Sequence, residues 1–309
     1  MTADGPPVLR IGTRGSNLAL SQTRTLESLL RAQSPGLQTE LVIIKTEGDV
    51  KPDEPLALMS GQGVFTRELD RALLDGRIDL AVHSLKDLPT EMREGIGLAA
   101  VSKREEERDA FLSNHCTSFD DLPEGAVLGT GSPRRKAQIL ARRPDLMVEA
   151  IRGNVETRIR KMDAGEVDAI LLACAGLIRL GLEDRITQRL PLEAFVPAPG
   201  QGALAVTVRK SDARSASIAS LANDPATASA VEAERAFLLR LGGGCRTPIA
   251  CHGSREGNVL EVTGFVATPN GRTVFRDRAI GRVEEARSLG EELANKLLVQ
   301  GAKEILLED

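Results

Sequence analysis

The 309-residue sequence predicts an α/β protein built from two doubly wound domains, followed by a small α+β domain. Three observations predict this class. Short apolar runs alternate with helical patterns along the first two thirds of the chain, which is typical of doubly wound folds. Two polar or Pro/Gly-rich segments divide that region, and Pro269-Asn270-Gly271 forms a strong hairpin signal near the end.

The apolar runs predict strands, and several are apolar at consecutive positions, as in strands buried on both faces of a parallel sheet. The expected strands occupy 7–14, 40–46, 78–85, 96–102, 126–131, 147–153, 167–174 and 203–209. Helical patterns are centred on 17–33, 64–75, 133–143, 154–164 and 226–241. The alternation predicts helices on both faces of each sheet.

The segments 102–110 and 196–206 are the expected crossings between the two α/β domains. The chain would leave the first domain, build the second and return. We therefore expect a first domain of 1–102 with 200–222, a second of 103–199, and an α+β domain of 223–309. Two such domains joined by two crossings would enclose a cleft.

Composition excludes several classes of function. The net charge is −4, and all seven aromatic residues are Phe, so a nucleic-acid partner is not expected. No run approaches the roughly 18 apolar residues of a membrane helix, and the N-terminal segment lacks a secretory pattern, which predicts a cytoplasmic protein without a membrane partner. Four cysteines without a CxxC pair and three scattered histidines predict neither a metal site nor a disulfide framework.

Three strand-to-helix turns share a cationic pattern. Residues 130–160 hold eight basic and three acidic side chains, a local charge of +5. Helix capping explains the Ser and Asn residues of these turns, but it does not explain arginines in a first turn, each unfavourable by roughly 0.3–1 kcal/mol. Several anionic groups on one ligand would explain them, and surface arginines that simply extend into water are the alternative. The absence of phosphate-loop signatures favours carboxylates as the anions. The turn residues concerned are Arg14, Ser16, Ser132, Arg134, Arg135, Arg152 and Arg158.

A Lys86-Asp87 pair ends another buried strand. The pair fits either a loop salt bridge or a carboxylate within a basic cleft, where Asp87 could stabilise a cationic intermediate or move protons. His83 lies within an apolar run and is expected to be structural. The polar, Gly- and Pro-rich segment 45–63 predicts a lid or a disordered loop.

Cys245 follows three glycines and precedes an arginine. Glycines allow close backbone approach, and a neighbouring arginine favours the nucleophilic thiolate. An incidental buried thiol fits this cysteine equally well. Cys174, within an apolar run, is expected to pack in a core.

Seven segments in order resemble the porphobilinogen deaminase (hydroxymethylbilane synthase) family over about 10–249. They are RIGTRGSNLALSQ, GVFTRELDRALLDGRIDLAVHSLKDLPT, LGTGSPRRKAQ, IRGNVETRI, DAILLACAGLIRLGL, PAPGQGALAV and ERAFLLRLGGGCRTPIA. The resemblance implies two domains similar to periplasmic binding proteins. It also implies a monomeric transferase that condenses four porphobilinogen molecules head to tail, releases ammonia and hydrolyses the product to hydroxymethylbilane.

The resemblance further implies a dipyrromethane cofactor joined through a thioether to Cys245, with Asp87 as the catalytic carboxylate. Lys86, Asp87, Ser132 and the two arginines at 134 and 135 would contact the cofactor. The pyrrole acetates and propionates explain the need for cations. The residues implied in substrate binding are Arg14, Ser16, Arg152, Arg158, Arg179 and Phe65.

Two positions depart from the family pattern. The stretch before Phe65, residues 58–63, contains no lysine, so a contribution of this loop to carboxylate binding is in doubt. Gly131 stands where the family has a first serine before Ser132, which removes one hydroxyl donor. Neither change removes a group that the chemistry requires.

Two other functions remain as alternatives. A non-catalytic receptor for a di- or tricarboxylate would use the same two-lobed cleft, but it would need neither Cys245 nor Asp87. A phosphate-binding regulatory domain is disfavoured because the phosphate-loop signatures are missing.

Overall fold

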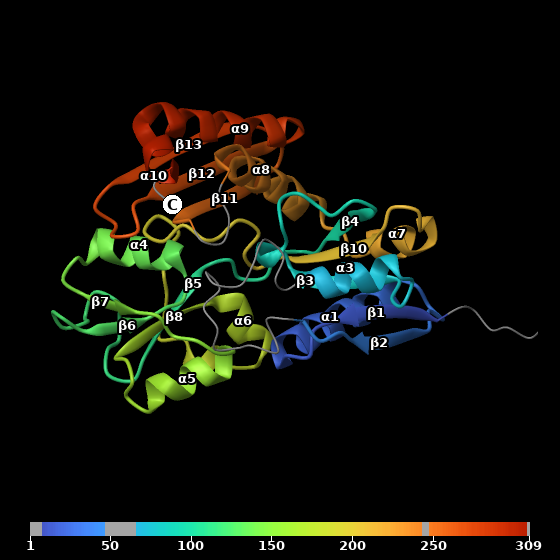
Figure 1. The fold of residues 1–309 in the computed structure, drawn as a ribbon, viewed down its shortest axis with the longest axis horizontal. Helices are drawn as coiled ribbons and strands as arrows, with labels where there is room; N and C mark the ends of the chain where they lie inside the picture. The colour runs from blue at the N-terminus through green and yellow to red at the C-terminus, as the bar shows by residue number, and fades with distance from the viewer. Residues whose placement is uncertain (1–7, 47–65, 243–246, 308–309) are drawn as a thin grey trace, which may run out of the picture. The chain divides into compact units, whose positions relative to one another are not determined.

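The computed structural model describes residues 8–46, 66–242 and 247–307 (Figure 1). The chain divides into two compact units. Unit 1 comprises 1–104 and 203–228, and unit 2 comprises 105–202 and 229–309. None of the helices within the described ranges is long and apolar enough to cross a bilayer.

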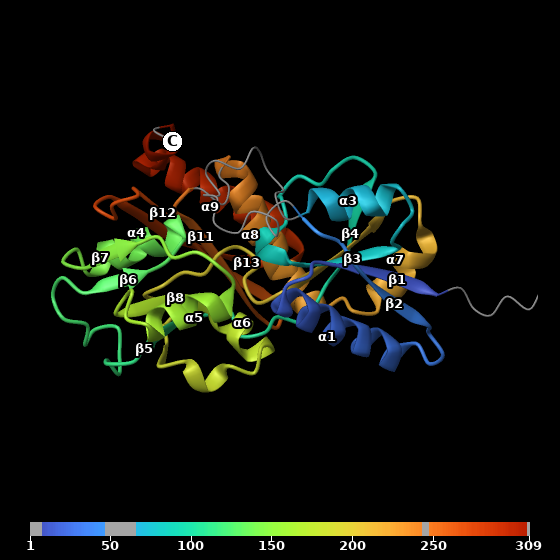
Figure 2. The same ribbon diagram turned by 60° about the horizontal axis from the view of Figure 1, so that its bottom comes forward.

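Unit 1 is built around a five-stranded sheet of order β2-β1-β3-β10-β4. Its strands are β1 (Leu9–Thr13), β2 (Thr39–Ile43), β3 (Leu80–Ser84), β4 (Ile96–Val101) and β10 (Leu204–Arg209), and its helices are α1 (Asn17–Gln33), α3 (Arg67–Leu74) and α7 (Ala213–Ser220). Residues of α1 and α7 pack on one face of the sheet, while residues of α3 share a core with Ile78, Ala81 and Ile96. Figure 2 shows α1 and α3 on opposite sides of the sheet.

The α/β part of unit 2 has a second five-stranded sheet, of order β7-β6-β8-β5-β9. It contains β5 (Asp109–Ser113), β6 (Val127–Gly129), α4 (Pro133–Arg142), β7 (Met147–Glu149), α5 (Val155–Asp163), β8 (Ala169–Ala173), α6 (Cys174–Arg179) and β9 (Gln188–Arg189). Ile139 of α4 packs on one face with Phe111, whereas α5 and α6 belong to a separate core around Ile170.

The C-terminal part of unit 2 is a three-stranded antiparallel sheet of order β11-β12-β13. Its elements are α8 (Pro225–Leu241), whose residues up to 228 belong to unit 1, β11 (Ile249–Glu256), β12 (Val259–Ala267), β13 (Val274–Arg282), α9 (Ala286–Leu297) and α10 (Lys303–Leu307). Phe237 of α8 and Leu293 of α9 fill the core on one face. Phe265, from the other face, packs with Ala137 of α4, which joins this sheet to the α/β part of the unit.

The expected α/β class is confirmed, and both five-stranded sheets are mixed, with parallel and antiparallel pairs. β1, β2 and β3 are parallel, yet β10 runs antiparallel between β3 and β4. In unit 2, β6, β7 and β8 are parallel, whereas β5 runs antiparallel to β8. β5 and β10 each enter a sheet after a crossing, and neither is linked by a helix to the strands beside it, so nothing forces them to be parallel.

Candidate active site

The first group of predicted site residues lies at one edge of the sheet in unit 1. Arg14 and Ser16 follow β1, and Lys86 and Asp87 belong to a single 3-10 turn that directly follows β3. β1 and β3 are parallel neighbours, so their carboxyl ends meet at the same edge. The structure therefore brings these four residues, all half-buried, to one edge of the sheet.

Helix α1 is held against this edge by polar contacts. Ser16 caps the helix, as predicted, by accepting a hydrogen bond from the Ala19 backbone N–H at 3.2 Å. The Gln22 side-chain amide donates to the Ser84 hydroxyl at 2.8 Å, which ties α1 to the end of β3 just before Lys86. The turn that carries Asp87 thus follows a strand end with little freedom to move.

His83 is buried within the sheet, in agreement with its expected structural role. Its Nε2 lies 2.9 Å from the Thr207 hydroxyl on β10. Burial, and then the positive charge of Arg14, lower the pKa of His83 to about 4. The imidazole is therefore neutral near pH 7 and adds no charge beside Asp87.

The second group lies at the corresponding edge of the sheet in unit 2. Ser132 caps α4 and Asn154 caps α5, each through its side-chain oxygen. These helices follow the parallel neighbours β6 and β7. A Cβ atom at Gly131 would lie 3.2 Å from the Ile151 carbonyl, so the two loops are in close contact. A serine at this position would require one of the two loops to shift by a few tenths of an ångström.

Arg134 and Arg135 do not extend into solvent. Both guanidinium groups bind Asp109, which is fully buried at the start of β5. Arg134 Nη1 donates to Asp109 Oδ2 at 2.8 Å, and Arg135 Nη2 donates to Oδ1 at 2.7 Å. The anion beside these two first-turn arginines is thus a carboxylate of the protein itself, which the sequence pattern did not indicate.

The Asp109 cluster, defined as Asp109, Arg134 and Arg135, carries a net positive charge. Burial opposes ionisation of Asp109, but the two guanidinium groups outweigh it and hold the pKa of the carboxyl below its usual range. Burial also lowers the pKa of Arg134, although Asp109 opposes that shift. Two cations facing one anion leave one positive charge at the N-terminus of α4, where the helix dipole also favours an anion.

The other arginines of unit 2 differ in their contacts. Arg158 Nε donates to the Gly153 carbonyl at 2.8 Å, and Arg179 Nη2 donates to the Gly202 carbonyl at 2.6 Å. Burial lowers the pKa of Arg179, and Glu105 opposes this shift. Among the described residues, Arg152 has no hydrogen-bond or ion-pair partner on the protein, so its half-exposed guanidinium is available to a ligand.

Several predicted features lie outside the described residues. These are Cys245, Phe65 and most of the 45–63 segment. Cys245 falls between α8, which ends at Leu241, and β11. Cys174 is fully buried, and burial, followed by nearby acidic groups, raises the pKa of its thiol to about 12, which confirms the expected core role.

Sequence reasoning missed Asp109 and Gln201. Gln201, which is 1% exposed, donates from Nε2 to Asp109 Oδ1 at 2.9 Å. Asp109 was included in the charged crossing 102–110, although the apolar residues 110–112 that follow it could have indicated the start of a strand. No local sequence signal pairs Asp109 with Arg134 or with Gln201, because these contacts span 25 and 92 positions.

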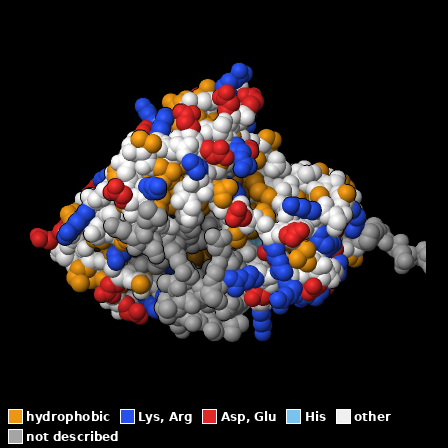
Figure 3. Space-filling view, turned by 45° about the horizontal axis from the view of Figure 1, so that its top comes forward, with side chains coloured by type: hydrophobic (Ala, Val, Ile, Leu, Met, Phe, Trp, Pro, Cys, Tyr) orange, Lys and Arg blue, Asp and Glu red, His pale blue; other side chains and the backbone are white. Residues whose placement is uncertain are grey.

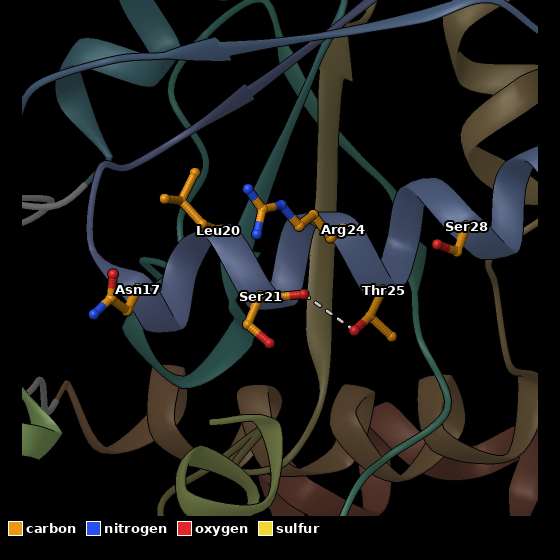
Figure 4. Close-up of a pocket in the computed structure, with 6 residues that line it drawn as sticks. All are labelled: Asn17, Leu20, Ser21, Arg24, Thr25 and Ser28. Atoms are coloured by element: carbon orange, nitrogen blue, oxygen red, sulfur yellow. Dashed lines mark hydrogen bonds between the residues drawn. The ribbon is translucent and has the colours of Figure 1, made fainter. Parts of the chain in front are cut away.

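A surface pocket of unit 1 is formed by one face of α1 (Figure 4). Thr25 Oγ1 within it donates to the Ser21 carbonyl at 3.1 Å, as drawn. All its lining residues come from this single helix, and none is a predicted site residue. They are Asn17, Leu20, Ser21, Arg24, Thr25 and Ser28. The pocket therefore does not mark the site.

The chain matches known proteins along most of its length. Residues 9–217 match the family model described as porphobilinogen deaminase, dipyromethane cofactor binding domain, and residues 228–299 match porphobilinogen deaminase, C-terminal domain. It is 50% identical over 301 residues to a porphobilinogen deaminase of Trichlorobacter lovleyi, covering 97% of this chain and 96% of that protein. A porphobilinogen deaminase of Geobacter metallireducens is 50% identical over 303 residues, covering 98% and 95%.

The chain also resembles solved structures. A periplasmic substrate-binding protein of an ABC transporter from Coxiella burnetii is 17% identical, with a TM-score of 0.44, over 72% of this chain and 94% of that one.

The structure defines an α/β protein with two five-stranded sheets, a C-terminal antiparallel sheet and cationic side chains at the ends of its parallel strands. The chain belongs to the porphobilinogen deaminase family. It is a transferase that condenses four porphobilinogen molecules head to tail with release of ammonia and hydrolyses the product to hydroxymethylbilane, and it uses a dipyrromethane cofactor. The alternative of a non-catalytic receptor is thereby set aside.

The residues present fit this cofactor. A dipyrromethane carries acetate and propionate carboxylates, and the net positive charge of the Asp109 cluster suits such groups. Arg152, on the adjacent loop, adds a cation without a protein partner among the described residues.

Proposed function

We propose that Asp87 is the catalytic residue of this transferase and that the cationic strand ends hold the pyrrole carboxylates. The observation that carries the proposal is the shared position of these residues: in each unit they follow parallel neighbouring strands at one edge of a sheet. Lys86, Ser132, Arg134 and Arg135 would bind the cofactor with Asp87. The proposed substrate-binding residues are Arg14, Ser16, Arg152, Arg158, Arg179 and Phe65.

Asp87 would act by electrostatics and proton transfer. Positive charge develops on the substrate as ammonia leaves, and again when the new bond forms between pyrroles. A carboxylate beside the pyrrole N–H groups stabilises that charge in both steps. The half-buried position of Asp87, after a strand that Gln22 ties in place, supports this role because a held carboxylate pays little reorganisation.

The arginines would act by binding. Each pyrrole ring carries two carboxylates, and guanidinium groups can bind carboxylates in a bidentate manner. Arg134 and Arg135 already hold Asp109, so they would contribute their remaining N–H groups and the excess positive charge of the cluster. No described residue bonds to the guanidinium of Arg152, so all of its N–H groups would be available to a pyrrole carboxylate.

Cys245 would attach the cofactor through a thioether. The cofactor, when bound, supplies the free pyrrole carbon to which the first substrate unit is joined. The test is the intact mass of the purified protein. An excess equal to two linked pyrroles is expected in the native protein and in Cys116→Ser, whose thiol is half-exposed, but not in Cys245→Ser. Retention of the excess in Cys245→Ser would exclude attachment at this residue.

The enzyme is further proposed to act as a cytoplasmic monomer without a nucleic-acid or membrane partner. Lys and Arg side chains are interspersed with Asp and Glu over the described parts of the face in Figure 3, and the net charge is −4. A net negative charge gives no overall attraction for a nucleic acid. Light scattering of the purified protein tests the oligomeric state, with a mass near 33.1 kDa expected.

A further inference from the structure

Glu234, on α8, is a fully buried carboxylate with two backbone partners. Its Oε2 accepts a hydrogen bond from the Gly200 N–H at 2.6 Å, and its Oε1 accepts one from the Gly253 N–H at 2.7 Å. The side chain is 0% exposed. Burial of a carboxylate is unfavourable unless its oxygens are hydrogen-bonded. The two bonds of Glu234 meet this requirement, and they link α8 to the loop at Gly200 and to β11 at Gly253.

The Gly200 contact leads directly to the Asp109 cluster. Gly200 has a φ of +75°, which favours glycine at this point of the loop. The next residue, Gln201, donates from Nε2 to Asp109 Oδ1 at 2.9 Å and to the Glu107 carbonyl at 2.7 Å. Asp109 in turn binds both arginines of α4. A path of hydrogen bonds, joined by the peptide bond between Gly200 and Gln201, therefore runs from α8 to α4 within unit 2.

The two ends of this chain of contacts carry proposed cofactor ligands. Helix α8 ends at Leu241, four residues before Cys245. Arg134 and Arg135 begin α4. The cysteine and the arginines must hold one covalently tethered, polyanionic ligand at the same time, so the spacing of α8 and α4 matters for binding. A displacement of about 1 Å can cost about a hundredfold in rate.

We propose that Glu234 is a positioning residue of the transferase. Through Gly200 and Gln201, it fixes the Asp109 cluster relative to the helix that leads to Cys245, and so aligns the arginines with the pyrrole carboxylates. The inference rests on the roles proposed above for Cys245, Arg134 and Arg135. Glu234 itself touches neither cofactor nor substrate in this account.

The first variant to compare is Glu234→Gln in the full-length, cofactor-loaded enzyme. The amide keeps the shape of the side chain, but its NH2 group cannot accept a hydrogen bond, so one glycine N–H loses its partner. We expect KM for porphobilinogen to rise at least fivefold, with a smaller change in kcat when kcat is calculated per cofactor-loaded enzyme. Glu232→Gln, an exposed change on the same helix, should leave both constants within twofold of native.

A second variant tests the path and does not depend on the folding of the first. Gln201→Met keeps the side-chain length but removes the link to Asp109. It should raise KM as Glu234→Gln does, and the double variant should be no worse than the more affected single variant, because both break one path. If the KM increase of the double variant equals the product of the two single increases, the two residues act independently, and the proposed path through Gln201 is wrong.

A Glu234→Gln enzyme with native KM but a lower Tm would overturn the positioning role and leave a structural one. If Glu234→Gln fails to fold, a native KM in Gln201→Met would overturn the proposal. Arg135→Leu, measured in parallel, tests the carboxylate-binding role of the arginines separately from the positioning role of Glu234. Native KM in Arg135→Leu would refute the carboxylate-binding role, whereas a raised KM there beside unchanged Glu234→Gln would refute the positioning role alone.

Discussion

Asp109 and Arg134 form a bidentate ion pair in the interior of unit 2, with Nη1–Oδ2 and Nη2–Oδ1 distances of 2.8 and 3.2 Å. The side chains are 0% and 6% exposed. A pair this deeply buried adds less stability than its distances suggest, because desolvation offsets attraction. Its consequence is geometric: it places the first turn of α4 on the start of β5, where Arg135, the second cation on Asp109, gives the cluster its net positive charge.

Removal of the shared carboxylate should destabilise the protein strongly. Asp109→Asn leaves two buried guanidinium groups without their anion, so we expect a loss of about 3–5 kcal/mol in the free energy of unfolding. Urea titration measures it. Asp163→Asn, which breaks the partly exposed ion pair with Arg185, should cost less than about 1 kcal/mol. Equal losses in the two variants would contradict the burial argument.

Asp87→Asn should remove most turnover while leaving the fold and the cofactor in place. The amide keeps the size of the side chain but cannot stabilise positive charge on the substrate, so we expect kcat to fall at least a hundredfold. Steady-state assay and intact mass measure the two effects. Glu91→Gln, an exposed change four residues further on, is the matched control. Near-native kcat in Asp87→Asn would refute the catalytic role.

Arg152→Leu should weaken substrate binding with little effect on stability. Its guanidinium has no protein partner among the described residues, so its loss breaks no internal contact. We expect KM for porphobilinogen to rise about tenfold, equivalent to about 1.4 kcal/mol, with Tm nearly unchanged. Arg160→Leu removes the same charge from an exposed position of α5 and should leave KM unchanged. Equal KM changes in both variants would indicate a general charge effect only.

The buried carboxyl group of Asp70 should make the free energy of unfolding depend on pH. It lies on α3, is 7% exposed, and its Oδ1 has no hydrogen-bond partner in the described structure. Burial is the main cause that raises its pKa from 3.8 to about 6, with Arg93 opposing the shift. The folded state therefore binds the proton more tightly than the unfolded state, and stability from this group is lost as pH rises through about 6.

Asp70→Asn removes that titration. We expect the variant to be about 1–3 kcal/mol more stable than native protein at pH 7.5, and the difference to vanish near pH 4. The low pKa of His83 is common to both proteins and cancels in the comparison. Denaturant titration at several pH values measures the difference, with Asp75→Asn on the exposed end of α3 as control. A difference that does not vary with pH would contradict the assignment.

Local sequence predicted many elements of the fold well. The pattern 17–33 is α1 as observed, and 133–143 and 154–164 match α4 and α5 to within one residue at either end. The Pro269-Asn270-Gly271 signal lies in the turn between β12 and β13. Caps and hydrophobic periodicity depend on residues a few positions apart, so these features are contained in short segments.

Strand direction and the third strand of the C-terminal sheet were missed. β5 was absorbed into a crossing, and β11, which follows the glycine-rich segment, was not recognised. The direction of β5 and β10 depends on where the chain re-enters each sheet, and no local pattern records that.

The candidate site divides in the same way. Its residue types and their positions after strands are visible in the chain, because a serine before a helix or an aspartate after a strand is a local feature. The partner of each arginine is not. Asp109 contacts Arg134 across 25 positions, and Glu234 contacts Gly200 across 34. Such pairings depend on how the sheets and helices pack. Only the tertiary structure therefore shows that the first-turn arginines bind an internal carboxylate, and that two cations there face one anion.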